Sequence, residues 1–207
     1  MKFTMKLLFT TAIVLGMGVS AYGNLLLNPS FEDGTGQGGH IDGADIDNWT
    51  AWGGDGWWAD NEVHDGDWSI RRWSPGLGIY QDVFDITPGG TYEASAWFFD
   101  DSGEPMDGDA YFELRLEWRE NDTTLSTDVI GTFNGGGTLD QWTEVSGFGT
   151  AHQDAEYVRF VISTEGTGDP WGRGTFDSAT LIPEPGTMAM LLLGGLGLVW
   201  ARRRRVS

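Results

Sequence analysis

Residues 111–119 read Tyr-Phe-Glu-Leu-Arg-Leu-Glu-Trp-Arg, and every second side chain in this stretch is a large apolar one. In an extended strand, Phe112, Leu114, Leu116 and Trp118 lie on one face, and the polar residues lie on the other. Such alternation is typical of an antiparallel strand with one face against a core and the other in solvent. No helical period is sustained between residues 24 and 182. The stretch therefore predicts a sheet protein.

The same period of two recurs along the chain and predicts further strands. Thr91–Phe99 and Tyr157–Ser163 show it most clearly. Weaker candidates are Leu25–Asn28, Trp57–Val63, Trp68–Trp73, Ile79–Ile86, Leu125–Phe133, Trp142–Phe148 and Thr175–Ile182. Gly-rich turn signals separate the candidates, and residues 33–67 have weaker periodicity, so we expect long loops there. The pattern predicts an all-β fold, an antiparallel β-sandwich or jelly roll, in one domain over residues 24–182.

The N-terminal end has the three-part layout of a secretory signal peptide. Lys2 and Lys6 precede an apolar run, residues 7–19, and small residues follow at Ala21 and Gly23. We place the signal helix at residues 1–23 with cleavage after Gly23, and cleavage after Ala21 is the alternative. The chain is therefore predicted to be exported.

The C-terminal end, residues 183–207, combines three features in a fixed order. Pro183-Glu184-Pro185 comes first, an apolar run follows at residues 186–200, and Arg202-Arg203-Arg204-Arg205 comes last. With the residues before it, the run is just long enough for a transmembrane helix. Arginines beside a span stay on the cytoplasmic side. The domain before the tail should therefore lie on the outer side of that membrane.

Composition excludes several classes of function. Of the 12 basic and 31 acidic residues, 6 and 30 lie within residues 24–182, which gives that region a net charge of −24. Such a field repels nucleic acid, so we expect no nucleic-acid partner. The chain has no cysteine, which excludes thiolate catalysis. Its three histidines form no HExxH motif, and no catalytic residue is predicted.

A glycosidase would need two carboxyl groups about 5–5.5 or 6.5–9.5 Å apart. Glu113 and Glu117 share one predicted strand and lie about 13 Å apart at about 3.3 Å per residue. They cannot form such a pair, although partners from different strands stay possible. Catalysis therefore has no positive support.

The C-terminal tail resembles the PEP-CTERM sorting signal of Gram-negative bacteria. The resemblance implies that Pro183, Glu184 and Pro185 are the recognition motif, and that the apolar run is a transient anchor in front of the arginine cluster. It also implies an exosortase as the partner that removes the tail near Pro183. The expected location is then the cell surface or the extracellular (biofilm) matrix. An ordinary anchor that is never cut is the alternative.

Four motifs, in this order, resemble those of galactose-binding-like jelly rolls, which include many carbohydrate-binding modules. They are Asn-Leu-Leu-Leu-Asn-Pro-Ser-Phe-Glu at residues 24–32, His-Asp-Gly-Asp-Trp-Ser-Ile at 64–70, Thr-Pro-Gly-Gly-Thr-Tyr-Glu-Ala-Ser-Ala-Trp at 87–97 and Gly-Thr-Phe-Asp-Ser-Ala-Thr-Leu at 174–181. Together they span nearly the whole predicted domain. The resemblance implies a jelly roll whose first and last strands are neighbours.

The same resemblance implies a structural Ca²⁺. Carried over to this chain, Glu32 and Asp177 supply carboxylates, Ser30 a backbone carbonyl, and the turn ending at Asp67 further oxygens. Six to eight hard oxygen ligands suit Ca²⁺, so two carboxylates with carbonyls and water are chemically sensible. The alternative is that Glu32 and Asp177 only cap turns or stay solvated.

Sugar binding needs an aromatic plane for stacking beside groups that bind hydroxyls. Tyr111, Glu113 and Arg115 share one strand face and offer that mixture. The predicted ligand-binding residues are Trp57, Trp58, Trp97, Tyr111, Glu113 and Arg115. Trp57 and Trp58 are adjacent, so only one of them can face the core.

The leading functional hypothesis is a non-catalytic protein that binds a poly- or oligosaccharide. A structural or adhesive surface protein that binds no soluble sugar, with every tryptophan in the core or under loops, is the alternative. A hydrolase is the third hypothesis.

Overall fold

The computed structural model describes residues 23–41, 45–53, 56–59, 61–106, 109–134, 138–167 and 172–184. The predicted signal peptide up to residue 22, Pro185, the apolar run and the four tail arginines (Arg202–Arg205) lie outside these ranges. In the part of the chain that is described, no helix is long and apolar enough to cross a membrane. The domain limits set from the sequence therefore stay predictions.

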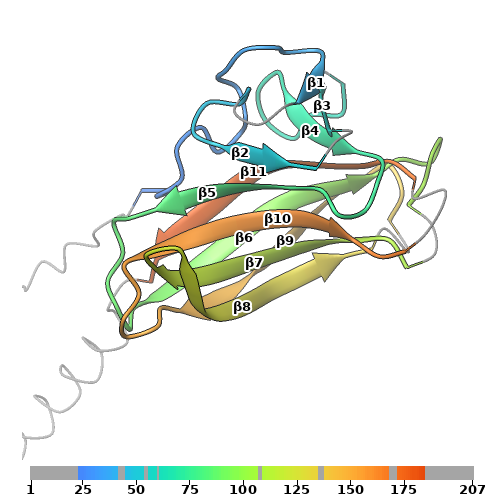
Figure 1. Cartoon of the computed structure of the whole chain (residues 1–207). Coiled ribbons are helices and arrows are strands. Elements are labelled where there is room, and N and C mark those ends of the chain that lie inside the picture. Colours follow the sequence, from blue (N-terminus) through green and yellow to red (C-terminus); the bar gives the residue numbers. More distant parts are fainter. Residues whose placement is uncertain are drawn as a thin grey trace, which may run out of the picture.

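Every regular element in the described ranges is a strand (Figure 1). The strands are β1 (His40–Ile41), β2 (Thr50–Trp52), β3 (Gly56–Ala59), β4 (Ser69–Arg72), β5 (Gly78–Val83), β6 (Thr91–Asp100), β7 (Tyr111–Glu120), β8 (Thr123–Phe133), β9 (Trp142–Thr150), β10 (Tyr157–Glu165) and β11 (Gly174–Pro183).

The strands form two stacked sheets. One has six strands in the order β1-β3-β4-β11-β6-β9, and the other has five in the order β2-β5-β10-β7-β8. All paired strands are antiparallel. In Figure 1 the five-stranded sheet lies in front and the six-stranded sheet behind it. This confirms the predicted all-β antiparallel sandwich.

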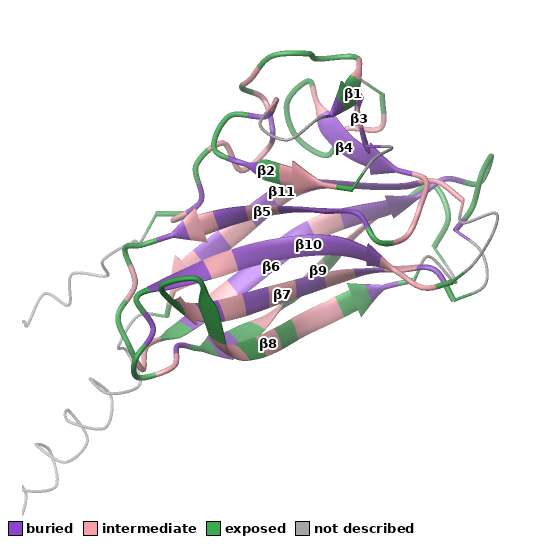
Figure 2. Ribbon diagram, in the orientation of Figure 1, coloured by how far each residue is buried: buried purple, intermediate pink, exposed green. Residues whose placement is uncertain are grey.

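The core lies between the two sheets, as the alternating pattern predicts. Phe112, Leu114, Leu116 and Trp118 of β7 are completely buried. Phe112 contacts aromatic rings of the facing sheet, with centroid distances of 5.2 Å to Phe98 and 5.7 Å to Phe176. Figure 2 shows the resulting change between buried and half-buried residues along β7. Burial of apolar side chains such as these is the main favourable contribution to folding.

The predicted strand at Leu25–Asn28 is wrong, because these residues form a series of bends. Asn28 has a positive φ of 49°. Its side-chain amide donates to the carbonyl oxygens of Asp33 and Asp47 and so turns the chain. The segment still lies beside β11, because Leu25 N–H donates to Leu181 O at 2.9 Å. The expected loops of residues 33–67 also contain the short strands β1, β2 and β3.

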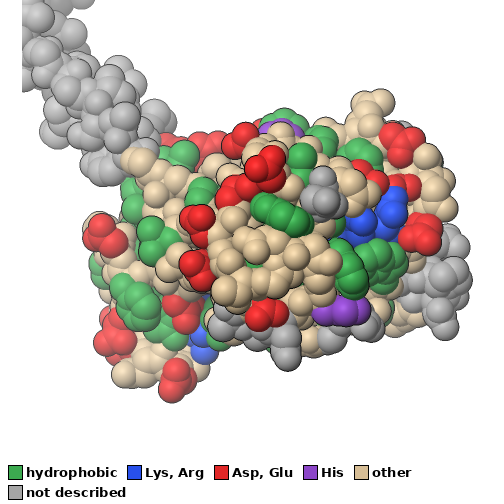
Figure 3. Space-filling view, turned by 90° about the horizontal axis from the view of Figure 1, so that it is seen from above, with side chains coloured by type: hydrophobic (Ala, Val, Ile, Leu, Met, Phe, Trp, Pro, Cys, Tyr) green, Lys and Arg blue, Asp and Glu red, His purple; other side chains and the backbone are tan. Residues whose placement is uncertain are grey.

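Acidic side chains are scattered over the face seen in Figure 3, and basic ones are few. The picture matches the strongly negative charge of the sequence.

Replacing Trp118 by Ala should strongly destabilise the sandwich. The indole is completely buried, and its N–H donates to Asp128 at 2.8 Å. Loss of a buried large aromatic leaves a cavity, so we expect the free energy of unfolding in urea to fall by about 3–5 kcal/mol. Phe148→Ala is the control, since Phe148 is 61% exposed and should change stability by no more than about 0.5 kcal/mol. Equal effects of the two substitutions would contradict this arrangement of the core.

Candidate functional site

The outer face of the five-stranded sheet carries a row of polar side chains from β7. Tyr111, Glu113, Arg115, Glu117 and Arg119 alternate with the buried core residues and are all half-buried. The prediction that they share one face is therefore confirmed. Charged side chains that are partly removed from water need hydrogen-bond or ion-pair partners in the protein. Such partners also fix the positions of the side chains.

Arg115 is the centre of this row. Its Nε lies 3.0 Å from Glu117, and its Nη1 lies 3.2 Å from Glu113 and 2.6 Å from the Ser163 hydroxyl. Ser163 belongs to β10 and is 2% exposed, so it forms part of the floor of the face. The guanidinium is thus held by groups from two strands.

Two aromatic residues that the sequence analysis did not single out, Tyr80 and Trp52, lie on the same sheet face as Arg115, beyond β10. Tyr80 of β5, Val161 of β10 and Arg115 of β7 are opposite one another across the three strands. The Tyr80 ring centroid is 6.0 Å from that of Trp52 on β2. The two rings therefore extend the β7 row across the sheet.

Arg159 lies against Tyr80, with its guanidinium carbon 3.8 Å from the ring centroid. Asp82 accepts two hydrogen bonds from this guanidinium, at 2.7 and 2.8 Å. These hydrogen bonds raise the pKa of Arg159 above its usual value. We call Trp52, Tyr80, Asp82, Arg115 and Arg159, together with Tyr111, Glu113 and Glu117, the aromatic–arginine face. The alternation of residues 79–83 could have predicted that Tyr80 and Asp82 face outward. The pattern is weak, because the polar Gln81 occupies a core position.

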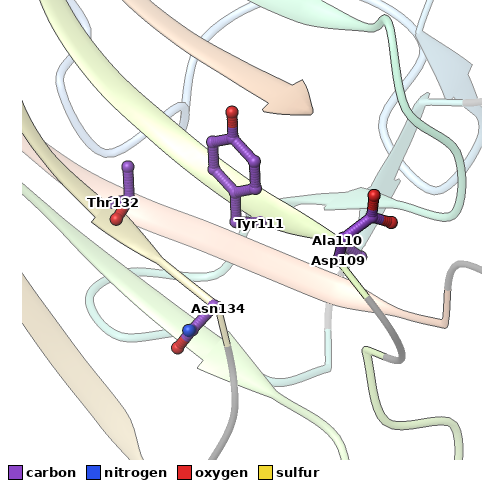
Figure 4. A pocket seen from close by; sticks show the side chains of 5 residues that line it. All are labelled: Asp109, Ala110, Tyr111, Thr132 and Asn134. Atoms are coloured by element: carbon purple, nitrogen blue, oxygen red, sulfur yellow. The ribbon is translucent and has the colours of Figure 1, made fainter. Parts of the chain in front are cut away.

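Gly78 allows Trp52 to pack on the sheet. A Cβ atom at Gly78 would lie 2.0 Å from the Trp52 ring, so any side chain there would displace the indole. At the other end, Tyr111 lines a hollow of about 340 Å³ between the start of β7 and the end of β8. Figure 4 shows the Tyr111 ring projecting from β7, with Thr132 and Asn134 from the β8 side. The aromatic–arginine face therefore has aromatic rings at both ends.

The structure does not bring the other predicted ligand residues to this face. Trp58 is completely buried, and its indole N–H donates to Phe31 O at 2.9 Å. The expectation of Trp58 as a stacking platform is therefore corrected: it pairs with Ile70 on the inner side of the six-stranded sheet. Its neighbour Trp57 points to the outer side, where its ring lies 4.7 Å from that of His40.

Trp97 also lies on the outer side of the six-stranded sheet and is half-buried. The His64 ring stacks on it with a centroid distance of 4.1 Å, and Trp142 lies 5.5 Å from His64. The predicted ligand residues are thus divided between both outer faces and the core, and only Tyr111, Glu113 and Arg115 are together.

A second site is formed where two carboxylates meet the turn at residues 64–68. Glu32 accepts hydrogen bonds from the backbone N–H of Asp67 and Trp68, both at 3.0 Å. Asp177 accepts from the N–H of His64 at 2.8 Å and from that of Asp65 at 3.1 Å. Glu32, Asp177 and this turn therefore lie together, as the predicted Ca²⁺ site requires. The hydrogen bonds that the two carboxylates accept from the turn are those expected if they only cap it.

Local backbone geometry makes this arrangement possible. Gly66 has a φ of 75°, and a Cβ there would lie 2.3 Å from Glu32 Oε1. Only glycine suits both conditions. On β11 the pairing with β6 shifts between Asp177 and Thr180, and Ser178 has a φ of 50°. This bulge locally re-aims the strand.

Burial raises the pKa of Asp177 to about 7, and the nearby charge of Glu32 adds to the effect, although backbone hydrogen bonds oppose it. Within the described ranges, neither carboxylate forms an ion pair with a basic residue. No group of three or more His, Asp or Glu side chains there is placed to hold a metal ion. A cation at this turn would therefore need backbone carbonyls and water beside the two carboxylates, and a buried acid without a basic partner is compatible with one.

Comparison with known proteins identifies the tail and the fold. Residues 181–205 match the family model of the PEP-CTERM protein-sorting motif, which confirms that the chain carries this motif. Comparison of the sequence with curated proteins gives no match.

Among solved structures, the fold is similar to the CBM22-1 xylan-binding domain of Paenibacillus barcinonensis Xyn10C. The identity is 18% and the TM-score 0.54, over 79% of this chain and 96% of that one. It is also similar to TmCBM61 in complex with β-1,4-galactotriose, with 18% identity and a TM-score of 0.55, over 78% and 99%.

A third similar structure is the CBM22-1-GH10 part of Clostridium thermocellum xylanase 10B, complexed with xylohexaose. The identity is 22% and the TM-score 0.51, over 67% of this chain. This chain spans only 26% of that structure. At such identities the likeness shows the fold alone, and it confirms the carbohydrate-binding-module type of jelly roll.

The raised pKa of Asp177 gives a testable pH dependence. The folded state holds this proton more tightly than the unfolded chain, whose carboxyl has its usual pKa of 3.8. The stability that this group contributes is therefore present below about pH 4 and is lost as the pH rises through about 7. In a chelator, the free energy of unfolding of the wild type should fall with pH, relative to Asp177→Asn, by as much as about 4 kcal/mol. Parallel stability curves for the two proteins would show that the carboxyl titrates normally.

Proposed function

We propose that this chain is an exported, non-catalytic protein that binds a poly- or oligosaccharide on its aromatic–arginine face. The observation that carries the proposal is the set of contacts that fixes the Arg115 guanidinium between Glu113 and Glu117, on the same sheet face as the rings of Tyr80 and Trp52. Rings can stack on the apolar faces of sugars, and fixed carboxylates and guanidinium groups can bind their hydroxyls. Pre-positioned groups lose little freedom when a ligand binds.

The charges of this face favour a neutral glycan. Three arginines on or beside it, Arg115, Arg119 and Arg159, make ion pairs with Glu113, Glu117, Glu165 and Asp82. The positive charges are therefore already balanced, and a polyanionic sugar would find no uncompensated cation among them.

The similar structures suggest which glycans to test. One is a xylan-binding domain, and another holds β-1,4-galactotriose. β-1,4-Galactotriose is neutral, in agreement with the charge balance of the aromatic–arginine face. We therefore choose xylan and β-1,4-galactan as the first probes.

The sorting motif supports the second part of the proposal, on location. We infer that an exosortase reads Pro183-Glu184-Pro185 and removes the tail near Pro183, so that the domain reaches the cell surface or the extracellular matrix. The match at residues 181–205 supports this location, and the signal-peptide pattern predicted at residues 1–23 agrees with it.

We also propose that the turn at residues 64–68 binds a structural Ca²⁺. Glu32 and Asp177 would supply the carboxylates, and backbone oxygens near Ser30 and Asp67 would supply further ligands. The ion would offset the burial of the Asp177 carboxylate, whose pKa is otherwise raised.

Loss of a ring from the aromatic–arginine face should weaken glycan binding. We expect Trp52→Ala, Tyr80→Ala and Tyr111→Ala each to reduce the affinity about tenfold, which corresponds to about 1.4 kcal/mol of lost stacking. Affinity electrophoresis through gels that contain xylan or β-1,4-galactan measures the change.

Trp57→Ala is the matched control, because Trp57 is a half-buried aromatic on the opposite sheet and should leave retention unchanged. A wild-type protein that no glycan of a broad panel retards would instead favour a structural or adhesive role. Release of reducing sugar from any of these glycans would contradict the non-catalytic assignment.

Calcium should raise the thermal stability of the domain. Binding to the folded state alone adds about 2.7 kcal/mol when the ion is present at about 100 times its Kd. We expect a higher melting temperature in Ca²⁺ than in chelator for the wild type, and no such difference for Glu32→Gln or Asp177→Asn. Glu120→Gln, at an exposed position, should respond like the wild type. A wild-type protein without a calcium-dependent shift would end the metal proposal.

A further inference from the structure

The end of the last strand contains the start of the sorting motif. β11 extends to Pro183, which lies opposite Tyr92 of β6. The backbone N–H of Glu184 donates to Thr91 O at 2.9 Å. The matched motif begins at residue 181, so strand and motif share residues 181–183. The first residues of the processing signal, 181–184, are therefore part of the folded domain.

The other side of this strand end is held by the first residues of the predicted mature domain. Leu25 N–H donates to Leu181 O at 2.9 Å. The Asn24 side chain accepts from Leu181 N–H and donates to Ala179 O, both at 2.9 Å. These contacts replace a neighbouring strand, because β4 pairs only with the beginning of β11. β11 is thus bound on both edges as far as Leu181, and the described contacts of residues 182–184 continue along the β6 edge.

Pro183 and Glu184 also line a hollow of about 310 Å³ beside the start of β6. Its remaining lining residues are Leu25, Asp85, Thr87, Gly90, Thr91 and Tyr92. Pro183 is half-buried, whereas Glu184 is exposed. An enzyme could therefore reach the Glu184 carboxylate in the folded domain, whereas the Glu184 backbone N–H is already bound by Thr91 O.

We propose that the folded sandwich masks the sorting motif, so that processing requires residues 181–184 to leave β6 and the Asn24–Leu25 segment. The proposal rests on the exosortase processing proposed above. A bound strand end is open in only a fraction of the molecules at any time. The apparent rate of a reaction that needs the open state is reduced in proportion to that fraction. Chains that have not yet closed the sandwich would be processed quickly, and folded chains slowly.

A linker that moves the motif out of the sheet tests this directly. Six Gly/Ser residues are inserted between Ile182 and Pro183 of the full-length chain. The insertion keeps Pro183-Glu184-Pro185, the apolar run and the arginines together, and it separates only residues 181 and 182 from the rest of the matched range. The same six residues between Gly36 and Gln37, in an exposed loop, give the matched control. In cells that carry an exosortase, pulse-chase labelling should show tail removal at least about fivefold faster for the first variant, and unchanged for the control.

Equal rates for the wild type and the Ile182–Pro183 variant would overturn the masking. A tail that is retained in every protein, the wild type included, would refute the exosortase proposal itself, and the masking would fall with it. Hydrogen exchange on the folded full-length chain gives a test that needs no enzyme. The amides of Leu25 and Glu184 should be protected, and free exchange at Glu184 within an otherwise protected sandwich would also overturn the masking.

Discussion

The aromatic packing of Phe98, Phe112 and Phe176 is the constraint on which the rest of the molecule depends. These rings join the two sheets and fix which side of each strand faces inward. Because side chains alternate, a shift of one strand by one residue would move all core residues of that strand to the solvent face. The inner faces thereby determine the outer ones: Arg115 and Tyr80 point outward because Leu114 and Ile79 are buried.

The sequence was sufficient for features that depend on neighbours along one strand. The alternation in β7 correctly predicted its core face and grouped Tyr111, Glu113 and Arg115 on the other. It could not say that Tyr80 lies across from Val161, because this pairing joins segments far apart in the chain. Adjacent tryptophans at 57 and 58 posed the same difficulty. Parity shows that only one faces the core, and the contact with Ile70 decides that it is Trp58.

The carboxylate site illustrates a different limit. Motif order brought Glu32, Asp177 and the turn at residues 64–68 together, and the structure agrees. The hydrogen bonds that the two carboxylates accept from backbone N–H groups could not be predicted. They depend on the positive φ of Gly66 and on the bulge after Asp177. The strand expected at Leu25–Asn28 failed for a similar reason, since side-chain amides replace ladder hydrogen bonds there.

The contact between Leu25 and Leu181 places the two ends of the described domain side by side. A fold whose ends adjoin can be inserted into a surface loop of a host protein, or joined end to end and reopened elsewhere, without altering its two layers. The aromatic–arginine face lies on the five-stranded sheet, whereas the ends meet at β11 of the six-stranded sheet. The sandwich is therefore suited to use as a transplantable unit in engineered fusions, with its outer sheet surface left accessible.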